Sequence, residues 1–281
     1  MLSFSFIIAI LIEIVFPFVL AFILVRKLKS SWALIGIGAL IFIASQLVHF
    51  PLVGIWNTLL PRVFADYSSV SVQILNAVVL GLLAGLCEET ARWIGYRILK
   101  QRGKTLKIAV ALGAGHGGIE SVLFVGIPVL ATFIVMNLVR SGVAIEGITP
   151  GMTSEYFSMS WLMPFVGAGE RLMAIVLHIT LSVAVWFSVT RHKPAWFWGA
   201  LAYHALVDAL VVALASLTGK VWMVEVVLAV FTAFNIYFLS RIAKIEALRE
   251  VADEMQLAEL PLTDRDDPGL ALFGQDEALD K

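Results

Sequence analysis

Seven long apolar runs alternate with short polar segments along this chain. The runs cover about residues 4–25, 32–55, 72–97, 107–139, 170–190, 195–217 and 221–241. Each run reaches the length of about 20 residues with which a helix crosses a bilayer. None of them alternates strictly between polar and apolar residues, as the strands of a membrane barrel do. Because only helices and closed barrels satisfy their backbone polar groups in lipid, the pattern predicts an all-α, polytopic bundle of transmembrane helices.

The number of spans depends on the fourth run. This run is longer than one simple span needs, and it contains Gly126 and Pro128. Proline removes a backbone donor and crowds the preceding turn, so we expect a kink or a break there. The sequence therefore predicts about seven spans, or eight if the fourth run divides.

Basic residues mark one side of the membrane. They gather after the first, third, fifth and seventh runs, whereas the other connections hold only Arg62, Arg140 and Lys220. The positive-inside rule places basic segments in the cytoplasm. We therefore expect an integral protein of a bacterial-type cell membrane, with its N-terminus outside and its C-terminus cytoplasmic. The basic segments contain Arg26, Lys27, Lys29, Arg97, Lys100, Arg102, Lys104, Lys107, Arg191, Lys193, Arg241, Lys244 and Arg249.

The composition supports a membrane protein and narrows its partners. The chain is 60% hydrophobic and 15% charged, against about 45–50% and about 25% in soluble domains. A net charge of −1 argues against a nucleic-acid partner. The expected partners are the lipid bilayer and a membrane protein or peptide substrate. The single cysteine, Cys87, excludes an intramolecular disulfide framework and a multi-cysteine zinc site.

Two parts of the chain differ in character. Residues 1–243 are predicted to form a transmembrane helical domain, whose candidate motifs lie between residues 70 and 215. Residues 244–281 are predicted to form a cytoplasmic tail. The tail begins as a charged helix, which reaches Leu260, and continues as an acidic segment whose Gly and Pro residues predict disorder.

Three charged residues interrupt the third run. Glu88, Glu89 and Arg92 lie within five residues of an otherwise apolar stretch. A charged group at membrane depth costs roughly 2.5–3.5 kcal/mol, so these groups need partners or a chemical role. Glu88 is four residues and Glu89 three residues before Arg92, so either carboxylate can pair with the arginine on one helix face. The other carboxylate is then free.

Three histidines lie at a similar depth on other helices. Counted from the nearest basic residue at the cytoplasmic end, Glu88, His116, His178 and His204 lie ~13 to ~20 Å deep at ~1.5 Å per residue. His116 and Glu120 are four residues apart, as are His204 and Asp208. Such a pair supplies two metal ligands, or a histidine with an orienting acid. The alternative for each pair is a buried polar contact that fixes helix packing.

Four motifs in this region together resemble the signature of YhfC-type intramembrane metalloproteases. That group belongs to the superfamily of CAAX-processing and bacteriocin-processing membrane proteases, which includes PrsW. The resemblance covers about residues 70–215. The arginine of the paired-glutamate motif comes one residue earlier than in the CAAX-processing branch, so CAAX specificity is not carried over. The motifs are Glu88-Glu89-Thr-Ala-Arg92, Gly-Ala-Gly-His116-Gly-Gly-Ile-Glu120, Glu170-Arg171 with His178, and His204-Ala-Leu-Val-Asp208.

The resemblance implies hydrolysis of peptide bonds in membrane-associated protein substrates. A glutamate in a low-dielectric site suits a general base, so Glu88 or Glu89 is expected to activate a water molecule, with Arg92 orienting or neutralising the other carboxylate.

Two versions of this chemistry remain open. In one, His116, His178 and His204 bind a zinc ion, with Glu120 and Asp208 as further ligands or as their hydrogen-bond partners. In the other, a glutamate activates the water without metal, and histidines hydrogen-bond the oxyanion.

Another class of function uses the same residue types. Intramembrane acids and histidines also serve proton- or ion-coupled transporters, and they can stabilise a non-catalytic scaffold. A transporter often contains internal repeats, and we find no such symmetry. Geometry separates the two classes, because a hydrolytic site requires these groups to converge, whereas a relay can arrange them along a path.

Overall fold

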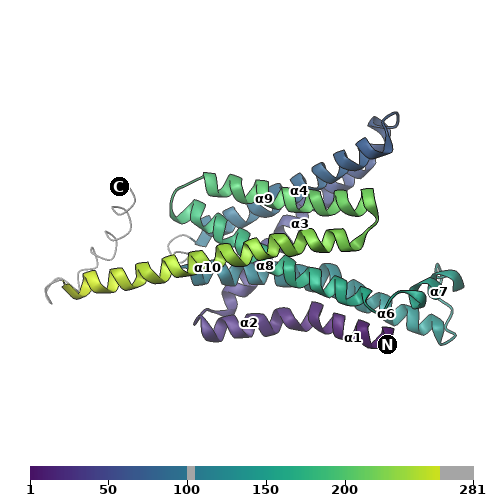
Figure 1. The fold of residues 1–281 in the computed structure, drawn as a ribbon, viewed down its shortest axis with the longest axis horizontal. Helices are drawn as coiled ribbons and strands as arrows, with labels where there is room; N and C mark the ends of the chain where they lie inside the picture. Colours follow the sequence, from purple (N-terminus) through teal and green to yellow (C-terminus); the bar gives the residue numbers. More distant parts are fainter. Residues whose placement is uncertain (100–104, 260–281) are drawn as a thin grey trace. The chain divides into compact units, whose positions relative to one another are not determined.

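The computed structural model describes residues 1–99 and 105–259, and every regular element in that part is a helix (Figure 1). The all-α prediction is confirmed. Lys100, Arg102 and Lys104, and the predicted disordered segment from Pro261, lie outside the described residues. The elements are α1 (Leu2–Ile10), η1 (Leu11–Val15), α2 (Phe16–Lys27), α3 (Trp32–Val63), α4 (Ser69–Leu99), α5 (Leu106–Glu120), η3 (Ser121–Gly126), α6 (Ile127–Arg140), α7 (Pro150–Ser158), α8 (Met163–Thr190), α9 (Ala195–Thr218) and α10 (Val221–Glu259).

Within residues 1–99 and 105–259, seven helical stretches are long and apolar enough to cross a membrane, which agrees with the predicted count. The chain divides into a compact unit, Met1–Asn235, and a second unit from Ile236, of which the end of α10 is described. The expected domain boundary at residues 243 and 244 stays a prediction. The seven stretches are Leu2–Lys27, Trp32–Val63, Ser69–Leu99, Leu106–Arg140, Met163–Thr190, Ala195–Thr218 and Val221–Ala247.

The fourth span is continuous, because a π-helical turn replaces the expected break. The turn η3 ends at Gly126, and Pro128 lies in the first turn of α6. A π turn is wider than an α turn, which leaves room for the proline ring and for a carbonyl group without its usual donor. A second π turn, η1, lies in the first span. The Ser121 hydroxyl donates to the Glu13 backbone carbonyl at 2.8 Å, so the two π turns contact each other.

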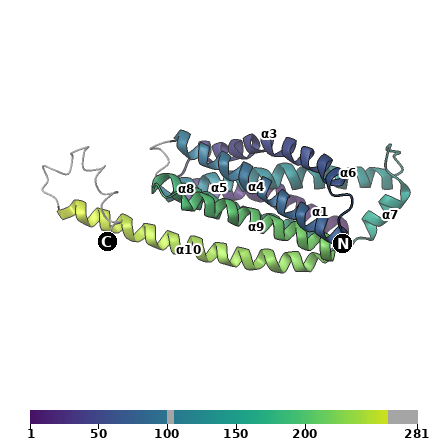
Figure 2. The same ribbon diagram turned by 90° about the horizontal axis from the view of Figure 1, so that it is seen from above.

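Glycines bring the site-bearing helices into close contact. Figure 2 shows α4 alongside α9, and α5 packs against α8. A Cβ atom at Gly81 would lie 2.3 Å from the Ala205 carbonyl oxygen, which no side chain tolerates. A Cβ atom at Gly117 would lie 3.1 Å from the Cβ atom of His178. Small residues at such interfaces let helix backbones approach closely, so α4, α5, α8 and α9 can surround one small volume.

An odd number of spans predicts that the two termini lie on opposite sides of the membrane. We expect alkaline phosphatase fused after Ser141 to be active, because that connection is predicted to be outside. Green fluorescent protein fused after Lys193 should fluoresce, because that connection is predicted to be cytoplasmic. The reverse pattern of enzyme activity and fluorescence would contradict the predicted orientation.

The close approach of α4 and α9 also makes a stability prediction. Gly81→Ala should lower the free energy of unfolding by about 1–3 kcal/mol, because the added methyl group overlaps the α9 backbone. Gly199→Ala is the matched control, since nothing lies within 4 Å of a Cβ atom there. Thermal unfolding in detergent compares the two variants. Equal melting temperatures would show that Gly81 is not at a tight contact.

Candidate functional site

The two adjacent glutamates of α4 have different surroundings. Glu89 is fully buried, and its carboxylate pairs with the Nη1 atom of Arg92. The Nδ1 atom of His204 on α9 lies 2.8 Å from Glu89 Oε1. Of the two pairings that the sequence allowed, the arginine therefore takes Glu89 and leaves Glu88 without an arginine partner among the interactions described.

Glu88 is surrounded by a glutamine and two histidines. The Gln46 amide on α3 donates to Oε1 at 3.1 Å, and His116 Nε2 on α5 lies 3.0 Å from Oε2. His178 Nδ1 on α8 lies 4.0 Å from the same Oε2 atom. Side chains from four helices thus meet at one carboxylate.

The hydrogen-bond partners assign the protons of two histidines. Arg92 Nη2 lies 3.1 Å from His178 Nδ1, and a guanidinium only donates, so Nδ1 accepts. His178 Nε2 then carries the proton and faces Glu120 Oε2 at 2.5 Å. His204 donates through Nδ1 to Glu89, so in the neutral imidazole its Nε2 lone pair is available to a metal ion. Each imidazole is therefore oriented by a carboxylate on one nitrogen.

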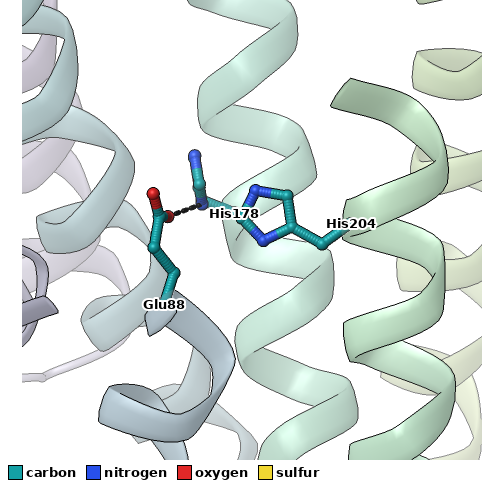
Figure 3. A group of neighbouring side chains, drawn as sticks. All are labelled: Glu88, His178 and His204. Carbon is teal, nitrogen blue, oxygen red and sulfur yellow. Dashed lines mark ion pairs between the residues drawn. The ribbon is translucent and has the colours of Figure 1, made fainter. Parts of the chain in front are cut away.

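Three of these side chains form a group that fits a metal ion. Glu88, His178 and His204 each offer one ligand atom, and the three atoms lie within 4.8 Å of one another (Figure 3). We call this group the Glu-His-His centre. One glutamate and two histidines are a ligand set of catalytic zinc sites. Metal-binding histidines usually donate their other N–H to a carboxylate. Here His204 donates to Glu89, and His178 Nε2 lies beside Glu120 Oε2. Metal binding at His178 Nδ1 would replace its hydrogen bond from Arg92.

The other predicted metal ligands lie beside this centre. His116 contacts Glu88 and meets the Phe42 ring edge-on, with ring centroids 5.0 Å apart. Glu120 lies between His178 and Arg171, whose Nη1 is 3.2 Å from Glu120 Oε1. Asp208 Oδ2 is 3.5 Å from His204 Nε2. The structure thus brings all the predicted residues together, but only His178 and His204 of the five predicted ligands belong to the close group.

Gln46 is a site residue that the sequence analysis missed. Its side chain is 6% exposed, and its Oε1 atom lies 3.0 Å from His49 Nδ1 while its amide nitrogen donates to Glu88. The available signal was a lone amide beside Ser45 in an apolar run. Nothing in that pattern reveals that the amide faces Glu88, because sequence gives no rotation of one helix relative to another.

A cavity of about 120 Å³ reaches the Glu-His-His centre from one side. All three residues of the centre line it, and so do Asp208 and Arg171. The centre therefore has room on its open side for water and for part of a bound molecule.

Comparison with known proteins identifies the family. The model of the YhfC intramembrane metalloprotease family matches residues 8–229, which is well over half of the chain. The uncharacterized membrane protein YhfC of Bacillus subtilis (strain 168) is 25% identical over 176 residues, which cover 58% of this chain and 67% of that relative. No solved structure matches this chain. The matched region contains every helix that contributes to the Glu-His-His centre, and the chain belongs to the YhfC intramembrane metalloprotease family.

Proposed function

We propose that this protein is an intramembrane endopeptidase, which hydrolyses peptide bonds of membrane-embedded protein substrates with a water molecule at the Glu-His-His centre. The observation that carries the proposal is the convergence of Glu88, His178 and His204 from three helices within 4.8 Å. Transporter relays pass protons along separated groups, whereas hydrolysis needs several groups at one water molecule. The convergence therefore favours a hydrolase over a transporter or a scaffold. The family description supports the same reaction class.

Glu88 is the general base in this proposal. As water attacks the scissile carbonyl carbon, a carboxylate oxygen of Glu88 accepts its proton, and Glu88 then delivers that proton to the leaving amine nitrogen as the C–N bond breaks. Gln46 and His116 hold the two carboxylate oxygens in place. Glu89 is unsuited to the role, because it is fully buried against Arg92 and His204 and is not among the residues that line the cavity, whereas Glu88 lines it.

The donor set also suits a zinc ion held by Glu88, His178 and His204. A bound zinc ion supplies Lewis-acid chemistry, which polarises a carbonyl group and acidifies water. Glu88 is then a ligand. Of the other cavity-lining carboxylates next to the centre, Glu120 is engaged by His178 and Arg171, which leaves Asp208, 3.5 Å from His204 Nε2. Asp208 takes over the proton transfer in that version. In both versions Glu89 and Glu120 keep the two imidazoles oriented.

Glu88→Gln tests the proposed activity directly. The substitution keeps the side-chain shape but removes the proton acceptor, so we expect peptide cleavage to fall by roughly 10²–10⁴-fold. Peptides with new N-termini in membrane proteins, identified by mass spectrometry, should appear in cells that express the natural protein and be absent with Glu88→Gln.

Glu155→Gln is the matched control for this experiment. Glu155 lies in the short helix α7, outside the centre, so its substitution should leave cleavage unchanged. Identical sets of new N-termini with the natural protein and with Glu88→Gln, at equal expression, would contradict the proposed role of Glu88.

A further inference from the structure

We propose that a water-filled path connects the Glu-His-His centre to the membrane face at which α8 and α10 begin. Its purpose, the supply of hydrolytic water, rests on the proposed function. The path itself is inferred from the cavity and from the burial of the residues around it. In the predicted orientation this is the outer face of the membrane. The depth of the centre was estimated from the cytoplasmic end of the helices, so the path leads toward the opposite face.

The cavity extends from the centre in one direction along α8. On this helix its lining includes Glu170, Arg171 and His178, a stretch that rises ~12 Å at ~1.5 Å per residue. Glu170 lies seven residues after Met163, the first residue of α8, so it is ~10 Å from that end of the helix. The opposite wall belongs to α10 and includes Leu228, Phe231, Thr232 and Asn235.

The charged side chains along this cavity are partly exposed and are not fully covered by other protein atoms. The side chain of Asp208 is 36% exposed, and those of Arg171 and Glu120 are 20% and 18% exposed. Charged groups within a membrane span are costly unless they face a partner or a water-filled cavity. Their accessible surface therefore indicates water in this space.

Unpaired polar atoms point to the same conclusion. Arg171 Nε and Glu225 Oε1 are two of the buried side-chain atoms that have no hydrogen-bond partner in the described part of the chain. Glu225 lies in the second turn of α10, and its carboxyl group hydrogen-bonds to Glu170. Buried polar groups are nearly always bonded to protein or to ordered water. Water along the path would satisfy both atoms.

The other side of the centre is closed. Beyond His178 toward the end of α8, Leu181 and Phe187 are at most 1% exposed. The Tyr96 hydroxyl of α4 and the Ser182 hydroxyl of α8 lie 2.6 Å apart there, so these two buried hydroxyl groups are bonded to each other. Close packing leaves no space for water in this direction. The path can therefore open only toward the beginning of α8.

The charge of the path predicts which solutes enter it. Glu120, Glu170 and Asp208 line the cavity with a single arginine, Arg171. A low-dielectric cleft lined by an excess of one sign concentrates ions of the opposite sign. We therefore expect small cations to enter more readily than small anions.

Thiol labelling of single-cysteine variants tests the path. Cys87 is the only cysteine of the chain, so Cys87→Ala provides the background. Thr232→Cys places a thiol in the cavity wall. Val230→Cys is the matched control, because Val230 lies two residues away on the same helix, is 65% exposed and is not among the cavity-lining residues, so we expect it to face lipid. The probes are membrane-impermeant methanethiosulfonates, one with a trimethylammonium group and one with a sulfonate group, added to intact cells.

We expect the thiol of Thr232→Cys to react from outside and that of Val230→Cys not to react. With each rate divided by the rate of the same probe with a free thiol in solution, the cationic probe should be favoured about ten-fold. Val211→Cys places a thiol on the α9 wall of the same cavity and should react like Thr232→Cys. Two cavity variants are used so that the misfolding of one does not decide the result. Reaction only in inside-out vesicles, no reaction of either cavity thiol, or equal reaction of Val230→Cys would overturn the proposal. Labelling needs no catalysis, so both cavity thiols should still react in Glu88→Gln, although the loss of one cavity carboxylate is expected to reduce the preference for the cationic probe. Failure of labelling alongside normal cleavage would reject the path and leave the proposed activity intact.

Discussion

The buried ion pair of Glu89 and Arg92 is the interaction on which the rest of the site depends. Both side chains are at most 1% exposed within a transmembrane span. Removing one partner of such a pair leaves an uncompensated buried charge, which typically costs about 3–5 kcal/mol. The same two side chains orient both histidines of the Glu-His-His centre, because Glu89 accepts from His204 and Arg92 donates to His178. The pair thus stabilises the bundle and sets the tautomers of the candidate ligands.

Close helix packing brings the other groups to this pair. Gly85 lies one turn before the glutamates and meets the α9 backbone, where a Cβ atom would be 2.8 Å from the Leu201 carbonyl oxygen. Gly117 follows His116 directly and meets α8 beside His178. The glycines therefore lie within one turn of the residues whose side chains converge. The same short stretches of sequence therefore let the helix backbones approach closely and bring the polar side chains of the site together.

The sequence predicted the parts of the structure that depend on distance along a helix. Apolar run length gave the seven spans, and counting from basic residues placed Glu88, His178 and His204 in one layer. The rotation of each helix about its own axis cannot be predicted from the distances between residues along the chain. The role of Gln46 was therefore missed, and the pairing of Arg92 with Glu89 rather than Glu88 stayed open. The π turn before Pro128 was not anticipated either, because its stability depends on the contact between Ser121 and Glu13 of the first span. Motif order was the strongest guide to the family, which the match over residues 8–229 confirms.

The most direct test of the account is zinc binding by the Glu-His-His centre. The purified protein, stripped of metal by a chelator and re-equilibrated with zinc, should bind about one zinc ion per chain by mass spectrometry. Glu88→Gln, His178→Ala and His204→Ala should each weaken the affinity by at least about ten-fold, since each removes one of three protein ligands. His192→Asn should bind normally, because His192 lies in the turn after α8 with φ 51, a conformation that asparagine tolerates. Zinc binding that is absent in the folded natural protein, or unchanged in all three variants, would contradict the assignment of these side chains to one metal centre.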